Sequence, residues 1–334
     1  MSIVRSASHA RELYASAGEK GWVLPCFCSE NLTTTEAILS AAETFRRSHA
    51  CGSLPVTVAI TCRYEHRSQA SFYTHTRRWD TGLKLFTNDL KALCEDGGPF
   101  ENLDVMIHLD HLQHDLDQEL LDSPLTDYAS VMYDASALPF EENIQKTAAY
   151  VARHKRDVLI EGACDEIQDA GGEAHNELTT PAQAKRYTEE TGTDLIVCNL
   201  GTEHRASGKE LKYSGEASRG IQAVTGKRIV LHGTSSVPND QVKNLFSDGV
   251  CKVNIWTALE RDSSPALFES MARNAGKLAD AATLQRLVSE GFLQSGTVSG
   301  GKADLAYFTT LYRQGIVFEK MKSIVGEYFE MWYT

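Results

Sequence analysis

The amino-acid sequence predicts an α/β protein built as a closed (β/α)8 barrel, the TIM-barrel architecture, with a C-terminal helical extension. Short apolar or β-branched runs alternate with longer stretches of helical periodicity, and that alternation is typical of a parallel sheet with crossover helices. The runs number eight, which fits one closed barrel better than an open sheet. The strands are expected at residues 23–27, 56–60, 105–109, 130–133, 158–161, 195–200, 229–231 and 250–255.

The helices are expected between these strands, and one of them carries a clear start signal, because Pro181 directly follows Thr180. No linker rich in Pro or Ser divides the pattern, so we expect a single barrel domain over residues 1–262. Residues 263–334 have a helical pattern and are expected to pack on the barrel or on a neighbouring subunit. The expected helices of the barrel are residues 33–47, 83–95, 141–154, 181–191 and 239–247.

Composition excludes several classes of protein. A net charge of −12 argues against binding to nucleic acid or to an anionic membrane, since both need clustered Lys and Arg. The N-terminus lacks the apolar segment of a signal peptide, and no window is long and apolar enough to span a bilayer, so we expect a cytoplasmic protein. The eight cysteines form no C-x-x-C pair, so we expect reduced, mostly buried thiols rather than a zinc–thiolate cluster.

Three histidines stand at the ends of three expected strands: His111 after the third, His204 after the sixth and His232 after the seventh. In a barrel the C-terminal ends of all strands face one mouth, so these side chains are expected to converge. Three neutral imidazoles around an open position are the ligand set of a catalytic zinc site. Zinc in such a site acts as a Lewis acid on a carbonyl or generates hydroxide. His108, earlier on the same strand as His111, is expected to be packed inside the barrel.

Asp110 precedes the proposed ligand His111 and should enter the same mouth. A carboxyl group there can transfer a proton during catalysis, or it can orient a histidine ligand. Gly233 and Ser235 follow the seventh strand, and Asn254 and Thr257 stand at the end of the eighth. The loops after strands seven and eight commonly bind phosphate in barrels, so these residues predict a phosphate site.

Taken together, these residues resemble the class II, zinc-dependent ketose-bisphosphate aldolase family, which includes fructose- and tagatose-bisphosphate aldolases. The similarity extends from about Gly21 to Thr257, and the C-terminal region matches loosely. The motifs that carry it are His108-Leu109-Asp110-His111, Met132-Tyr133-Asp134-Ala135-Ser136 continuing into Leu138-Pro139-Phe140-Glu141-Glu142-Asn143, Leu178-Thr179-Thr180-Pro181, Gly201-Thr202-Glu203-His204, His232-Gly233, and Lys252-Val253-Asn254-Ile255.

The resemblance implies a (β/α)8 lyase of carbohydrate metabolism that cleaves a ketose phosphate between C3 and C4, giving dihydroxyacetone phosphate and an aldehyde. It implies that His111, His204 and His232 hold Zn²⁺, which polarises the ketone and stabilises the enediolate. It further implies that Asp110 shuttles the proton on the C4 oxygen and that Asn254 hydrogen-bonds the enediolate. The residues that it assigns to substrate or phosphate are Thr61, Gly233, Ser235, Thr257 and, by a loose match, Lys209.

The family's mobile loop, which supplies a proton-abstracting glutamate, is altered in this chain. Glu173 is the best match for that base, and Asp169 or His175 are alternatives. The resemblance also implies a homodimer or homotetramer, and it allows a monovalent cation beside the zinc. The imidazole ligands suit cobalt, manganese or iron as well as zinc.

Several departures from the family pattern indicate a substrate other than fructose 1,6-bisphosphate. Arg205 stands where the family usually has glycine, and it could grip a carboxylate, sulfonate or phosphate, or form a salt bridge at the surface. Ala163 replaces the second acid of a Glu-x-Glu motif, Thr234 replaces a glycine, and Trp256 replaces a small or acidic residue. Two alternatives stay open: a catalytically retired sugar-phosphate-binding or regulatory subunit, which the lost acid and the altered loop favour, and a barrel metallohydrolase that uses the zinc-bound water.

Overall fold

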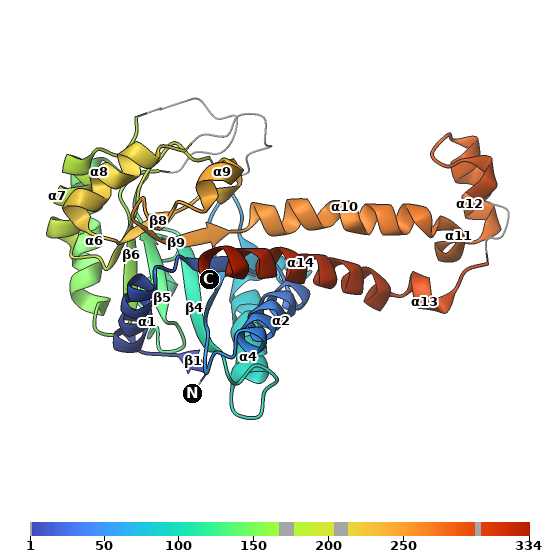
Figure 1. Cartoon of the computed structure of the whole chain (residues 1–334), viewed down its shortest axis with the longest axis horizontal. Coiled ribbons are helices and arrows are strands. Elements are labelled where there is room, and N and C mark those ends of the chain that lie inside the picture. The colour runs from blue at the N-terminus through green and yellow to red at the C-terminus, as the bar shows by residue number, and fades with distance from the viewer. Residues whose placement is uncertain (1, 167–176, 204–212, 298–301) are drawn as a thin grey trace.

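The computed structural model describes residues 2–166, 177–203, 213–297 and 302–334, and in it eight parallel strands close into a barrel (Figure 1). Each strand pairs with its neighbour in chain order, and the last, β9, pairs with the first, β2. All eight predicted strands are confirmed. They are β2 (Leu24–Cys28), β3 (Pro55–Thr61), β4 (Asp104–Gln113), β5 (Ser130–Asp134), β6 (Leu159–Ala163), β7 (Leu195–Val197), β8 (Ile229–Leu231) and β9 (Val250–Ile255).

A further strand, β1 (Ile3–Val4), was not predicted and lies outside the barrel ring. It pairs in parallel with the start of β4, where Ile3 lies opposite Val105. β5 joins the same edge of β4 only from His108 onward, so β1 occupies the part of that edge that β5 leaves uncovered. With two residues, β1 is too short to give a periodic signal.

The helices between the strands begin and end at recognisable signals. In α7 (Pro181–Thr191), Thr180 and Gln183 form a capping box, Pro181 is the first helical residue, and Gly192 ends the helix with a φ of 69°. The expected helix at residues 239–247 is shorter than predicted: α9 covers Asn239–Val242, and turns follow it. The other helices of the barrel region are α1 (Ala7–Lys20), α2 (Leu32–Ser48), α3 (Gln69–Phe72), α4 (Trp79–Cys94), α5 (Gln118–Leu121), α6 (Phe140–His154) and α8 (Gly215–Thr225).

Three polar side chains from three different strands meet inside the barrel. His108 of β4, Glu161 of β6 and Lys252 of β9 are each fully buried. Nζ of Lys252 lies 2.7 Å from Oε2 of Glu161 and 3.1 Å from Nε2 of His108. Because Nε2 of His108 faces the ammonium group, its Nδ1 carries the proton and donates to Oγ of Ser130 at 2.8 Å. His108 is therefore a packed barrel residue, as predicted.

The C-terminal region forms a long helical arm (Figure 1). α10 (Thr257–Arg273) begins at the barrel and runs away from it, and α14 (Thr310–Trp332) returns beside it. The end of α14 packs on the barrel against α2, where Phe329 contacts Phe27 and Phe45 with ring centroids 5.7 and 5.8 Å apart. α10 runs through residues 262 and 263, and the division into two domains there stays a prediction. The short helices of the arm are α11 (Ala275–Leu278), α12 (Ala281–Ser289) and α13 (Leu305–Phe308).

Candidate active site

A bulge at the end of β4 aims two adjacent side chains into the same pocket. The pairing of β4 with β5 shifts register between Leu109 and Leu112, and His111 has a φ of 48°. Successive residues of a regular strand point to opposite faces, so Asp110 and His111 could share a pocket only with such an irregularity. A left-handed backbone is uncommon for histidine and is found chiefly where the surroundings enforce it. Asp110 therefore enters the mouth beside His111, as predicted.

The pocket lies at the C-terminal ends of β3, β4, β8 and β9. Its walls include Asp110, His111 and His232, together with Asn254 and the loop that begins at Gly233. This is the end of the barrel at which (β/α)8 enzymes keep their catalytic groups. The structure thus joins the predicted histidines of β4 and β8 with the predicted phosphate loop in one cavity.

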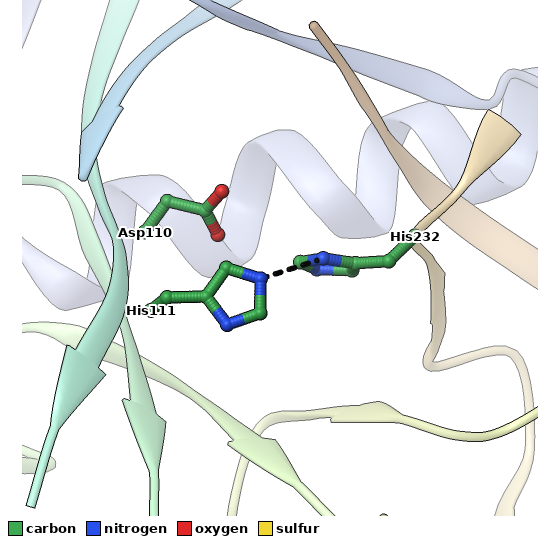
Figure 2. A group of neighbouring side chains, drawn as sticks. All are labelled: Asp110, His111 and His232. Carbon is green, nitrogen blue, oxygen red and sulfur yellow. Dashed lines mark hydrogen bonds between the residues drawn. The ribbon is translucent and has the colours of Figure 1, made fainter. Parts of the chain in front are cut away.

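His111 is held by contacts on both ring nitrogens and on one ring face. Its Nδ1 lies 2.8 Å from Oδ2 of Asp134, so Nδ1 is the protonated nitrogen and Nε2 is directed at His232. The ring of Tyr64 stacks on the imidazole with centroids 4.1 Å apart and planes 3° apart. Nε2 of His111 lies 3.1 Å from Nδ1 of His232. Figure 2 shows these two atoms facing each other, with the Asp110 carboxylate beside them.

The donor set fits a divalent metal ion. Asp110, His111 and His232 each offer a ligand atom, and these atoms all lie within 4.8 Å of one another. Two nitrogens bound to one tetrahedral zinc at about 2.05 Å are about 3.3 Å apart, close to the distance between the two histidines. The hydrogen bond from His111 to Asp134 is the outer-shell contact that metal-binding histidines usually make.

The Asp110 carboxylate is buried and hydrogen-bonded. Its Oδ1 accepts from Nδ2 of Asn254 at 2.9 Å, and Sγ of Cys28 lies 3.7 Å from its Oδ2. Burial by itself raises the pKa of Asp110, but the nearby imidazoles of His111, His108 and His232 outweigh it and hold that pKa well below its usual value. Asp110 is therefore a carboxylate at neutral pH, in a position to accept a hydrogen bond from a bound hydroxyl group.

Asn254 has one satisfied and one unsatisfied side-chain atom. Its Nδ2 donates to Asp110, which fixes the orientation of the amide because a carboxylate only accepts. Its Oδ1 is buried and has no hydrogen-bond partner among the described residues. A buried amide oxygen without a partner costs stability, so this atom is available to a ligand donor.

The loop after β8 has the features of an anion site. Gly233 has a φ of 67°, and a Cβ atom there would lie 2.7 Å from the carbonyl oxygen of Glu203, so only glycine fits. The hydroxyl groups of Thr234 and Ser236 hold the loop, donating to the carbonyl oxygens of Asn254 at 2.9 Å and Gly233 at 2.7 Å. The Oγ of Ser235, in contrast, is buried without a hydrogen-bond partner in the described chain.

The start of α10 faces the same cavity. Thr257 and Ala258 line the pocket, and the N-cap residue, Trp256, makes no side-chain capping hydrogen bond. Unsatisfied backbone N–H groups and the helix dipole make such a start favourable for anions. The predicted phosphate residues Gly233, Ser235 and Thr257 therefore lie in one pocket.

Thr61 lines the pocket, but its hydroxyl group is used within the protein. Its Oγ1 donates to the carbonyl oxygen of Arg67 and accepts from the backbone N–H of Gln69 at 3.0 Å. The side chain of Gln69 in turn accepts from the N–H of Thr61 at 2.9 Å. In this structure Thr61 joins the two ends of the loop after β3.

Four of the predicted site residues lie outside the described residues, namely Glu173, His204, Arg205 and Lys209. The alternative bases Asp169 and His175 lie outside them as well. The third metal ligand, the proton-abstracting base and the role of Arg205 therefore stay predictions.

The sequence did not lead us to assign a function to three residues of the site. Asp134 was noted only as part of a motif, although an acid at the end of a strand next to His111 is a signal for an outer-shell partner. Tyr64 and Arg67 belong to the irregular loop after β3, where no periodic pattern indicates which side chains turn inward.

Comparisons with known proteins agree with this geometry. The family model for class II fructose-bisphosphate aldolase matches residues 8–297. The chain belongs to the class II fructose-bisphosphate aldolase family. It is 31% identical over 275 residues to the fructose-bisphosphate aldolase of Streptococcus pyogenes serotype M1, covering 79% of this chain and 83% of that protein. The predicted resemblance is thereby confirmed, and membership of this family supports the predicted aldolase activity.

Solved structures of two other aldolases share the fold. A fructose-bisphosphate aldolase from Campylobacter jejuni superposes with a TM-score of 0.76 at 19% identity, covering 99% of this chain and 95% of that one. The YdjI aldolase from Escherichia coli K12 superposes with a TM-score of 0.65 at 19% identity, covering 96% and 95%. Within the described residues of this class II aldolase, no helix has the length and apolar character needed to cross a lipid bilayer.

Proposed function

We propose that this class II aldolase is metal-dependent and reversibly cleaves a ketose phosphate, other than fructose 1,6-bisphosphate, to dihydroxyacetone phosphate and an aldehyde. One observation carries the proposal: the metal-type cluster of Asp110, His111 and His232 shares a single pocket with the anion-type loop at Ser235. A sugar phosphate needs both, since its carbonyl must be polarised and its phosphate must be held.

The metal is proposed to be Zn²⁺, bound by His111, His232 and the predicted third ligand, His204. Zinc, when bound, supplies a Lewis acid that draws electron density from the substrate ketone. The donor set supports this assignment, because Nε2 of His111 and Nδ1 of His232 are 3.1 Å apart. The other ring nitrogen of His111, Nδ1, already contacts Asp134. For the predicted monovalent cation we assign no ligands.

Asp110 and Asn254 are proposed to act on the substrate oxygens. In cleavage, Asp110 accepts the proton of the C4 hydroxyl group as the C3–C4 bond breaks, and it returns that proton in the condensation direction. Asn254 bonds to Asp110 through Nδ2 and has a second polar atom free of partners in the described chain, so it can hold both the carboxylate and a substrate hydroxyl group. Glu173 is proposed to protonate the former C3 carbon of the ketose, as the enediolate becomes dihydroxyacetone phosphate, and to remove that proton in the condensation direction.

The phosphate is proposed to lie between Ser235 and the start of α10. The unpartnered Oγ of Ser235 supports this position, as do the uncapped N–H groups near Thr257. Trp256, which replaces a smaller family residue, lines the same pocket and reduces the space on that side. Its bulk supports a substrate that differs from fructose 1,6-bisphosphate.

The protein is further proposed to be a cytoplasmic homo-oligomer in which the helical arm contacts a second copy of the chain. Phe268 of α10 and Leu311 of α14 are 77% and 76% exposed. Exposed apolar side chains on both helices of one projecting arm are typical of an interface between subunits (Figure 1).

Proton exchange tests the proposed reaction without knowledge of the aldehyde. We expect the metal-loaded protein to exchange a hydroxymethyl proton of dihydroxyacetone phosphate with deuterated water, as measured by NMR. A chelator should abolish the exchange and Zn²⁺ should restore it. The variant His111→Ala should lose both the metal and the exchange, whereas His154→Ala, on α6, serves as the matched control. Exchange and metal content that survive in His111→Ala would refute the proposal.

Binding without exchange would favour the alternative of a retired regulatory subunit. That outcome would be tight binding of dihydroxyacetone phosphate by the metal-loaded protein, with no deuterium incorporated in the presence of candidate aldehydes. Four convergent polar groups at the pocket, namely Asp110, His111, His232 and Asn254, speak against it, because a site that only binds has no need of a buried carboxylate beside a metal.

A further inference from the structure

Arg67 lines the same cavity as the phosphate loop. It belongs to the loop between β3 and α3, and among the described residues it is the one Lys or Arg in the wall of this pocket. The chain carries a net charge of −12, so an anionic substrate needs a local cation to offset the overall field.

The Arg67 side chain is held in place by an acid and an indole. Its Nε donates to Oε1 of Glu30 at 2.9 Å, and its Nη2 donates to Oε2 of the same carboxylate. Nε1 of Trp256 also donates to Oε1 of Glu30, at 2.7 Å. The guanidinium group lies 4.5 Å from the ring centroid of Phe72 and 5.6 Å from that of Trp256. The backbone of Arg67 is fixed as well, through the hydrogen bond from Thr61.

This anchoring leaves part of the guanidinium group available. Glu30 occupies the edge formed by Nε and Nη2, and Nη1 donates to no group in the described chain. The other edge, formed by Nη1 and the second hydrogen of Nη2, is a planar fork that matches two oxygens of a phosphate group.

Two acidic side chains lie near Arg67, namely Glu30 and, on α10, Glu260. Glu260 offsets only part of the positive charge of Arg67. Burial, followed by repulsion from Glu30, raises the pKa of Glu260 to about 7, so Glu260 carries a proton in a substantial fraction of molecules near neutral pH.

We propose that Arg67 is a substrate-binding residue that contacts the phosphate held by Ser235 and the start of α10, and that Glu30 and Trp256 are its positioning residues. The inference rests on the proposed function and adds to it the cation that recognises the phosphate. It also gives Trp256 a role: its indole orients the acid that orients the arginine. Glu30 is not part of the pocket wall, so in this arrangement it acts through Arg67.

Calorimetric titration of the metal-loaded protein with dihydroxyacetone phosphate tests the proposal. Arg67→Met is expected to bind this ligand about 10- to 100-fold more weakly than the wild type, the loss typical of a charged hydrogen-bonding partner. Arg67→Lys, which keeps the charge and loses the fork, should give an intermediate affinity. Arg63→Met is the matched control, because Arg63 lies in the same loop, stacks on Trp79 at 4.4 Å and donates to the carbonyl oxygen of Leu116 at 2.9 Å.

Unphosphorylated dihydroxyacetone separates phosphate binding from a general loss of structure. Its Michaelis constant in condensation should be the same in the wild type and in Arg67→Met, whereas the constant for the phosphate ester should rise. If the wild type binds dihydroxyacetone phosphate and both Arg67 variants bind it equally well, the inference is overturned and the proposed function stands. If the wild type itself does not bind dihydroxyacetone phosphate, both the inference and the proposed function are overturned.

Discussion

Oδ2 of Asp134 lies 2.8 Å from Nδ1 of His111, and this contact fixes which nitrogen of the imidazole faces the pocket. The acid is itself held by Ser136, whose hydroxyl group donates to its other oxygen at 2.6 Å. Burial alone raises the pKa of Asp134, but the hydrogen bond and charge of His111 lower it well below its usual range. The acid therefore stays ionised and keeps His111 in one tautomer.

From this relationship we predict that Asp134→Ala weakens metal binding by about 10- to 100-fold, because loss of the outer-shell partner frees the ring and lowers its basicity. The affinity is measured by competition with a chromophoric chelator. Asp122→Ala, at an exposed position after α5, should leave the affinity unchanged. An equal affinity in Asp134→Ala and the wild type would contradict the role of this contact.

The strands could be predicted because their sequences are apolar on both faces. In β9 four of the six residues are apolar, Lys252 and Asn254 being the exceptions, and the structure gives the strand the predicted limits. α1 has mixed small and charged residues and gave no clear apolar stripe, so it was missed. β1 is held by two residue pairs with β4, a tertiary contact that no local pattern encodes.

The site was predictable where its residues follow strands and was not where it depends on irregular backbone. His111, His232 and Asn254 follow from their strand ends alone. The φ of 48° at His111 could not be foreseen, because such a conformation is usually signalled by glycine. Arg67 could not be foreseen either, because its inward position results from the hydrogen bonds of Thr61 and Glu30 rather than from any period in the sequence.

A second prediction concerns the ion pair inside the barrel. Lys252 and Glu161 are both fully buried and 2.7 Å apart, so removing one partner leaves a buried charge. Lys252→Met should lower the free energy of unfolding by about 3–5 kcal/mol, and the double variant Lys252→Met/Glu161→Leu should recover most of that loss. Urea unfolding of the metal-free proteins measures both. Arg286→Met, which breaks an exposed pair with Glu290, should cost less than about 1 kcal/mol.

A third prediction follows from the raised pKa of Glu260. Burial, and after it repulsion from the Glu30 carboxylate, raises the pKa of Glu260 from 4.5 to about 7 in the folded protein. Between pH 4.5 and 7 the folded state therefore binds more protons than the unfolded state. The free energy of unfolding should therefore fall as the pH rises from about 4.5 to 7, and Glu260→Gln should remove this fall.

The size of that effect is of order 1 kcal/mol, because Glu260 is partly screened by solvent. Thermal unfolding at pH 5 and pH 8 measures this effect. At pH 8 Glu260→Gln should be more stable than the wild type. Glu269→Gln, an exposed change on the same helix, should show no such dependence on pH. A variant that is less stable than the wild type at pH 8 would refute the argument.

A last prediction concerns the arm. The apolar side chain of Leu311 on α14 is 76% exposed, and it lines a hollow with Tyr312 and Ile316. A stable contact between two copies needs about 800 Å² from each, with an apolar centre, so a charge at this position should weaken it strongly. Leu311→Asp should shift the protein toward the monomer in sedimentation velocity, whereas Val224→Asp, at an exposed site of the barrel helix α8, should not. If Leu311→Asp has the same mass distribution as the wild type, the arm does not hold the subunits together.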